Sequence, residues 1–174
     1  MLQMKLLQQL PDLLTAPLSG LEISLAYIIG GAVRGTVNGI LVLCLGVFLI
    51  DFQVQDIIGT IGFIVLVSWA FASMGLILGQ LAENWDQMAM MQNFFLTPLS
   101  FLGGIFYSIH MLPDWAQNLS FANPIYYMIN GIRFTILGVS DSPVNASFWM
   151  ALLLTVLFTT AAILLMQSGK KIKQ

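Results

Sequence analysis

IIGTIGFIVLVSWAFASMGLILGQL, residues 57–81, decides the fold class of this chain because the whole stretch contains no charged side chain. A helix needs about 20 predominantly apolar residues to cross the hydrocarbon core of a bilayer. The stretch is also too long and too evenly apolar for a strand of a membrane barrel, in which polar and apolar residues alternate. We therefore predict a membrane-spanning helix over residues 57–81.

Three further runs have the same apolar character and cover residues 23–50, 88–107 and 147–166. Only one charged side chain, Arg34, interrupts them. A spanning segment must satisfy its backbone hydrogen bonds internally, which favours helices. The composition agrees, since 58% of the residues are hydrophobic and 8% are charged, against about 25% charged in soluble domains. We predict an all-α integral membrane protein with about four transmembrane helices in a single domain, residues 1–174.

The segment before the last predicted span, residues 108–146, is different because polar and helix-breaking residues recur along it. Such residues are costly in lipid, where water cannot satisfy the freed backbone groups. We expect two short helices, about residues 113–121 and 125–137, which dip into the membrane or lie at its surface. Trp115 suits an interfacial depth. The segment is therefore predicted to form an extracytoplasmic re-entrant or interfacial hairpin.

The orientation of the chain follows from its lysines. Lys170, Lys171 and Lys173 lie close to the carboxyl terminus, and Lys5 lies close to the amino terminus. Cytoplasmic segments carry an excess of Lys and Arg, and an even number of spans places both termini on one side. We expect both termini in the cytoplasm.

One face of the first predicted span carries polar and small residues. Five residues fall within an arc of roughly 100° on an ideal helical wheel: Tyr27, Gly31, Arg34, Gly35 and Asn38. A charged side chain at the bilayer centre costs about 2.5–3.5 kcal/mol on insertion scales, so it usually faces protein or water. The face is a candidate for packing on a neighbour and for lining a polar cavity. Simple packing, with Arg34 extending to the cytoplasmic interface, is the alternative.

The third predicted span contains Pro98 and is closely followed by Gly103 and Gly104. Proline removes a backbone hydrogen bond, so these residues are candidates for a gating hinge, with a static kink as the alternative. His110 is the only histidine and has no neighbouring cysteine or carboxylate cluster, so we expect no metal site. Cys44 is the only cysteine, which excludes an intrachain disulfide.

Motifs of the common catalytic classes do not occur in the sequence. It has no Walker A loop, no G-x-S-x-G and no H-E-x-x-H. A nucleophile would need a nearby base, and the single histidine lies in a loop. We therefore expect that the chain is not an enzyme and binds no cofactor itself.

One stretch carries several distinctive elements in a fixed order: NFFLTPLSFLGGIFYSIHMLPDWAQNLSFANPIYYMINGIRFTILG, residues 93–138. The elements are Pro98, Gly103-Gly104, Phe106-Tyr107, Leu112-Pro113-Asp114-Trp115, Asn123-Pro124-Ile125-Tyr126, Arg133 and Gly138. In this order they resemble the end region of type-2 ABC exporter permeases. The drug, lipid and polysaccharide exporters of bacteria, including nodulation-factor exporters, are the branch that the stretch most resembles.

A second stretch, DLLTAPLSGLEISLAYIIGG at residues 12–31, resembles a cytoplasmic loop and the following span of the same permeases. The resemblance implies that residues 1–22 include a coupling segment that docks on the ATPase subunit. The residues implied in coupling are Leu13, Leu14, Pro17, Leu18 and Ser19. Three leucines just before a span also form a small apolar surface, so an ordinary interfacial anchor is the alternative.

The resemblance implies a permease subunit in the bacterial inner membrane that exports a drug, a lipid or a polysaccharide-like substrate. ATP would be used by a separate ABC ATPase subunit, and two permease copies would form the unit, with no nucleic acid involved. Family members have about six spans, so we expect this chain to be truncated at its amino-terminal side. A truncated membrane protein that does not transport, a channel and a secondary transporter are the alternatives.

Overall fold

The computed structural model describes residues 2–7 and 18–168 of the chain. Within these residues every regular element is a helix, which confirms the predicted all-α class. The elements in chain order are α1 (Leu2–Leu6), α3 (Gly20–Ile50), α4 (Ile57–Leu81), α5 (Trp85–Met91), η1 (Gln92–Leu96), α6 (Thr97–Leu102), η2 (Ile109–Met111), α7 (Asp114–Ala122), α8 (Pro124–Leu137) and α9 (Val144–Ser168).

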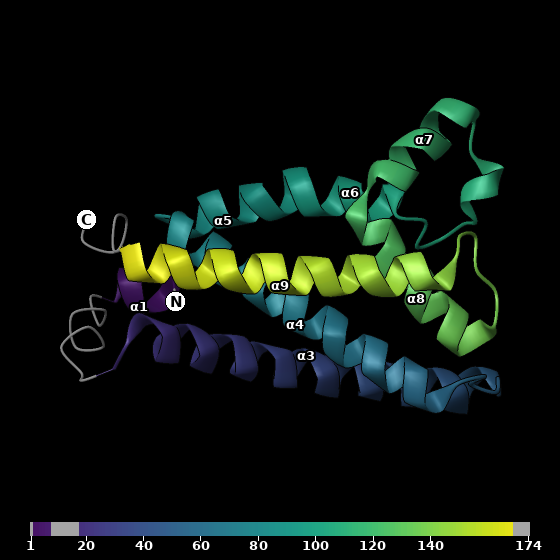
Figure 1. Ribbon diagram of the computed structural model, residues 1–174, viewed down its shortest axis with the longest axis horizontal. Helices are drawn as coiled ribbons and strands as arrows, with labels where there is room; N and C mark the ends of the chain where they lie inside the picture. Colours follow the sequence, from purple (N-terminus) through teal and green to yellow (C-terminus); the bar gives the residue numbers. More distant parts are fainter. Residues whose placement is uncertain (1, 8–17, 169–174) are drawn as a thin grey trace.

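Helices α3, α4 and α9 form the body of the molecule and lie side by side along its long axis (Figure 1). Each is long and apolar enough to cross a membrane, with a mean hydropathy between 2.0 and 2.3 over its most apolar window. Helix α4 has the bounds predicted from its uncharged stretch, and it contacts both other helices. The start of α3 and the end of α9 lie at the same end of the bundle.

Helix α3 approaches α4 closely because glycines line the contact. A Cβ atom added to Gly31 would lie 3.0 Å from the Cβ of Ala72, and one added to Gly39 would lie 2.9 Å from the Cγ2 of Ile64. Larger side chains would push the two helices apart, and the close approach increases the van der Waals contact that holds helices together in lipid. The glycines therefore set the spacing of the bundle.

Both ends of α3 are defined by local hydrogen bonds. At its start the Ser19 hydroxyl accepts from the Glu22 amide, and the Glu22 carboxylate accepts from the Ser19 amide, which together form a capping box. At its end Asp51 adopts a left-handed conformation with φ of 53°. The helix contains 31 residues, so it is about 46 Å long at a rise of 1.5 Å per residue.

The third predicted span is an interrupted helix that extends from Trp85 to Leu102 as α5, η1 and α6. The Thr97 amide bonds to the carbonyl of Gln92, five residues back, which defines a π turn just before Pro98. The segment is about 27 Å long. It ends at Leu102 and not at the predicted residue 107, because Gly103 and Gly104 turn the chain away, with Gly104 at φ of 77°.

The predicted hairpin contains two helices, α7 and α8, with bounds close to those expected from the sequence. Helix α8 packs on α4 and α9 around a core that includes Phe63, Met128 and Leu154. A Cβ atom added to Gly131 would lie 2.2 Å from the Cε1 of Phe63. The absence of a side chain at residue 131 thus lets α8 lie against α4.

We predict that Gly131→Ala destabilises the fold, because the added methyl group must displace the Phe63 ring within a packed core. Overpacking of this kind costs about 1–3 kcal/mol. Gly62→Ala on α4 is the matched control, since no atom lies within 4 Å of its added Cβ. Unfolding of both variants in detergent micelles would measure the effect. Equal stability of the two would contradict the predicted contact.

Candidate functional site

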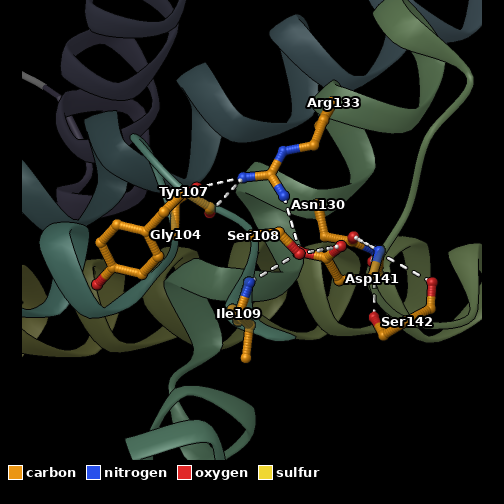
Figure 2. A network of polar contacts seen from close by, with 9 residues as sticks. Gly104, Tyr107, Ser108, Ile109, Asn130, Arg133, Asp141 and Ser142 are labelled. Carbon is orange, nitrogen blue, oxygen red and sulfur yellow. Dashed lines mark hydrogen bonds and ion pairs between the residues drawn. The ribbon is translucent and has the colours of Figure 1, made fainter. Parts of the chain in front are cut away.

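A polar cluster connects the end of α6, helix α8 and the start of α9 (Figure 2). At its centre a guanidinium nitrogen of Arg133 lies 2.9 Å from a carboxylate oxygen of Asp141. Both side chains are largely covered, with 17% and 6% of their surface exposed. Arg133 also donates to the backbone carbonyls of Gly104 and Tyr107. The Arg133 guanidinium thus binds the carboxylate of Asp141 and two backbone carbonyls of the irregular segment that follows α6.

Asp141 uses both of its carboxylate oxygens and its own amide to extend the cluster. Its carboxylate accepts from the Ser108 hydroxyl at 2.9 Å and from the Ile109 amide at 3.1 Å. Its amide donates to the side-chain oxygen of Asn130 at 2.9 Å. The Asn130 amide group in turn donates to the hydroxyl of Ser147 at 2.9 Å. The loop after α6 is therefore fixed to α8 and α9 through side chains.

The charge of Asp141 is maintained by these contacts. Burial alone raises the pKa of its carboxyl group, but the hydrogen bonds from Ser108 and Ile109 and the charge of Arg133 outweigh burial. The net result is a pKa below the ordinary value of 3.8. Because the pKa is lowered, the ion pair stabilises the fold at neutral pH and is lost only when the pH falls through the lowered pKa.

The cluster holds the loop after α6 in place. Its polar groups are already paired with one another, and the described residues include no group of three or more His, Cys, Asp or Glu side chains suited to a metal. The sequence analysis named Arg133 only as an element of the stretch over residues 93–138, and it did not name Asp141 as a site residue. A signal was available in the sequence, because residues 108–146 contain few charged side chains and two of them are Arg133 and Asp141. We name this group the Arg133–Asp141 cluster.

The structure divides the polar face that was predicted for α3. Gly31 and Gly35 face α4, and a Cβ atom added to Gly35 would lie 3.0 Å from the Ser68 hydroxyl oxygen. Tyr27 is half-buried, and its hydroxyl lies 2.5 Å from the sulfur of Met4. Arg34 and Asn38, by contrast, are exposed.

Arg34 has no hydrogen-bond or ion-pair partner among the residues that the structure describes. Its neighbour one turn along, Asn38, lines a groove of about 510 Å³ between α3, α4 and α8. The apolar side chains of Val42, Ile64 and Ile136 form part of its wall. The exposed part of the predicted face is thus an unpaired cation beside an apolar groove.

The predicted coupling segment is only partly described. Leu13, Leu14 and Pro17 lie outside the described residues. Leu18 is 50% exposed, and Ser19 caps α3. Within the described part of the chain, a half-exposed apolar side chain therefore lies immediately before a long helix.

The three candidate hinge residues lie in and after the interrupted helix. Pro98 follows the π turn, and a Cβ atom added to Gly103 would lie 2.6 Å from the Cδ1 of Ile129 on α8. Gly104 is fixed by Arg133. The side chains of α5, η1 and α6 include no buried residue, so this helix is loosely packed along its length. The hinge role stays a prediction.

The sequence profile described as "ABC-2 type transporter" matches residues 9–137. The inner membrane transport permease YadH of Escherichia coli K12 is 36% identical over 169 residues, which cover 97% of this chain and 66% of YadH. Nodulation protein J of Sinorhizobium fredii is 40% identical over 70 residues, which cover 40% of this chain and 27% of that protein. The protein of the same name from Rhizobium leguminosarum bv. viciae is 33% identical over 75 residues, 43% of this chain and 29% of its own length. No solved structure matches this chain.

We predict that Asp141→Asn lowers the free energy of unfolding by about 3 kcal/mol, because it leaves the covered Arg133 charge without a counter-charge. Asp114→Asn is the control, since this exposed acid of α7 has no ion-pair partner among the described residues. Unfolding in micelles near neutral pH would measure both variants. The difference between wild type and Asp141→Asn should shrink as the pH falls below 3.8. A difference that is absent at neutral pH would contradict the role of the pair.

Proposed function

This chain belongs to the ABC-2 type transporter family, and from this membership we propose that it acts as the transmembrane permease subunit of an ATP-driven exporter. The observation that carries the proposal is the similarity to an inner membrane transport permease over 97% of this chain. The chain spans 66% of the length of that relative. The exported substrate would be a drug, a lipid or a polysaccharide-like molecule, in keeping with the branch that residues 93–138 resemble.

We assign the chain to a bacterial inner membrane with both termini in the cytoplasm. The arrangement of the helices supports an even number of crossings, since α3 begins and α9 ends at the same end of the bundle (Figure 1). The interrupted helix from Trp85 to Leu102 provides the fourth crossing, about 27 Å long against a hydrocarbon core of about 30 Å. The Arg133–Asp141 cluster then lies at the outer face.

The chain's own contribution to transport is a change of shape. We assign ATP binding and hydrolysis to a separate ABC ATPase subunit and assign no cofactor to this chain. Two permease copies with two ATPase copies would form the working unit. Such a permease needs two conformations that contact the ATPase differently, because ATP binding by the ATPase then favours one conformation over the other.

The start of α3 is the proposed point of coupling. Leu18 has an exposed apolar side chain. It directly precedes Ser19, whose capping box with Glu22 begins α3. Glycine contacts then hold α3 tightly against α4. A displacement of the coupling segment by the ATPase would therefore be carried along a rigid helix pair to the outer end of the bundle.

We predict that Asp114→Cys reacts with an impermeant thiol reagent added outside intact cells. Glu83→Cys, in the loop between α4 and α5, should react only after the membrane is opened. Cys44 is exposed and must be replaced by alanine in both variants. The reverse pattern would place the Arg133–Asp141 cluster in the cytoplasm and overturn the proposed orientation.

We predict that Leu18→Asp weakens association with the proposed ABC ATPase subunit. A leucine buried in a docking groove contributes about 1.5–3 kcal/mol, so its loss should weaken binding by about 10-fold to 100-fold. Co-purification and stimulated ATP hydrolysis in the full-length protein would measure the effect. Met111→Asp is the matched control, since Met111 is 81% exposed in η2, just before α7, which lies at the opposite end of the molecule (Figure 1). If both variants retain full association, the segment is only an interfacial anchor.

A further inference from the structure

Arg34 lies at the middle of the membrane-spanning bundle. Its neighbour Gly35 faces Ser68, and Ser68 lies next to the midpoint of α4, which extends from Ile57 to Leu81. The hydrocarbon core is about 30 Å thick, so lipid phosphates lie about 15 Å from this level. Arginines at this depth usually face a water-filled cavity or an opposite charge, and they mark the paths of substrates. Arg34 therefore requires an anionic or aqueous environment.

No acid among the residues that the structure describes is placed to neutralise Arg34. Along α3 the nearest acids are Glu22, about 18 Å toward the start of the helix, and Asp51, about 25 Å toward its end. The other described acids lie outside α4 and α9, and they are Asp56, Glu83, Asp86, Asp114 and Asp141. A second copy in the same orientation would bring its acids to the same levels, and its own arginine to the level of Arg34. Pairing between copies therefore adds positive charge at this depth.

The groove beside Asn38 supplies the second observation. It extends from Asn38 past Val42 and Gly46 toward Ile136, and Asn38 is its one polar side chain. Its volume of about 510 Å³ is within the usual range of small-molecule sites. Asn38 is one helical turn from Arg34, so both side chains lie on one side of α3. This face of α3 thus presents the charge of Arg34 at the middle of the membrane, and the apolar groove continues from Asn38 toward one membrane surface.

We propose that this face binds the exported molecule and that the molecule is an anionic amphiphile. Its phosphate, sulfate or carboxylate group pairs with Arg34 and accepts a hydrogen bond from the Asn38 amide. Its hydrocarbon part lies in the groove lined by Val42, Ile64 and Ile136. The proposal rests on the exporter function and narrows its substrate class. It requires that water reaches Asn38 from one side of the membrane.

The first test measures water access and charge, and it needs no ATPase. In the full-length protein with Cys44→Ala, reconstituted in phosphatidylcholine vesicles, Asn38→Cys should react with both an anionic and a cationic methanethiosulfonate reagent. The anionic reagent should react faster. Adding Arg34→Gln should lower the ratio of the two rates by about tenfold, the effect of removing one unit charge about 6 Å away in water. Leu157→Cys, on an exposed part of α9, is the lipid-facing control and should not react.

The second test identifies the ligand class by protection. Dodecyl phosphate should slow labelling of Asn38→Cys by about tenfold at ten times its Kd, as mass action requires. Dodecyltrimethylammonium should not protect. Arg34→Gln should abolish protection by dodecyl phosphate, whereas Arg34→Lys should retain part of it because the charge is kept.

Several results would overturn the proposal. An unreactive Asn38→Cys in the inserted protein would show that lipid or another helix covers the face. Equal rates for the two reagents with Arg34 present, or equal protection by the two amphiphiles, would exclude recognition of an anion. Loss of labelling on adding phosphatidylglycerol alone would identify a membrane lipid as the occupant. None of these results depends on ATPase association, so the exporter assignment would be judged separately by the Leu18→Asp test.

Discussion

Inside a bilayer each backbone amide and carbonyl must find its partner within the protein, because lipid offers none. Helices α3, α4 and α9 meet this requirement without interruption over their whole length. Where the chain leaves the helices after α6, its backbone is irregular, and there Arg133 bonds to the carbonyls of Gly104 and Tyr107 while Asp141 accepts from the Ile109 amide. The two charged side chains thus satisfy backbone hydrogen-bonding groups of this segment. They also attach one end of the loosely packed interrupted helix to α8.

The long spans were predictable because they depend on composition alone. A run without charge, such as residues 57–81, has few alternatives to a spanning helix, and the structure has α4 at these bounds. The end of the third span was not predictable, because an apolar run continues past Gly103 while the chain turns there. Neither helical periodicity nor hydropathy predicts that the backbone turns at Gly103 and Gly104.

The sites could be predicted only in part for a similar reason. A helical wheel places Gly31, Arg34 and Asn38 on one face, but it does not show which neighbour lies opposite each residue. In the structure the glycines face α4, and the two polar residues are left exposed. The Arg133–Asp141 pair depends on how the chain turns after α8, and the few charges of this segment indicate a pair without giving that turn. The patterns in the sequence therefore indicate which residues share a face or carry charge, but not which residue each of them contacts.

The length of α3 makes the protein sensitive to the thickness of its membrane. The helix is about 46 Å long, and it is apolar to its last turn, where Phe48, Leu49 and Ile50 are at least 75% exposed. A hydrocarbon core of about 30 Å cannot cover such a helix upright, so the mismatch is relieved by tilting or by local thickening of the bilayer. Lipids with longer acyl chains would bring α3 closer to the membrane normal. Bilayer composition would in this way bias the angle between α3 and the membrane surface at Leu18.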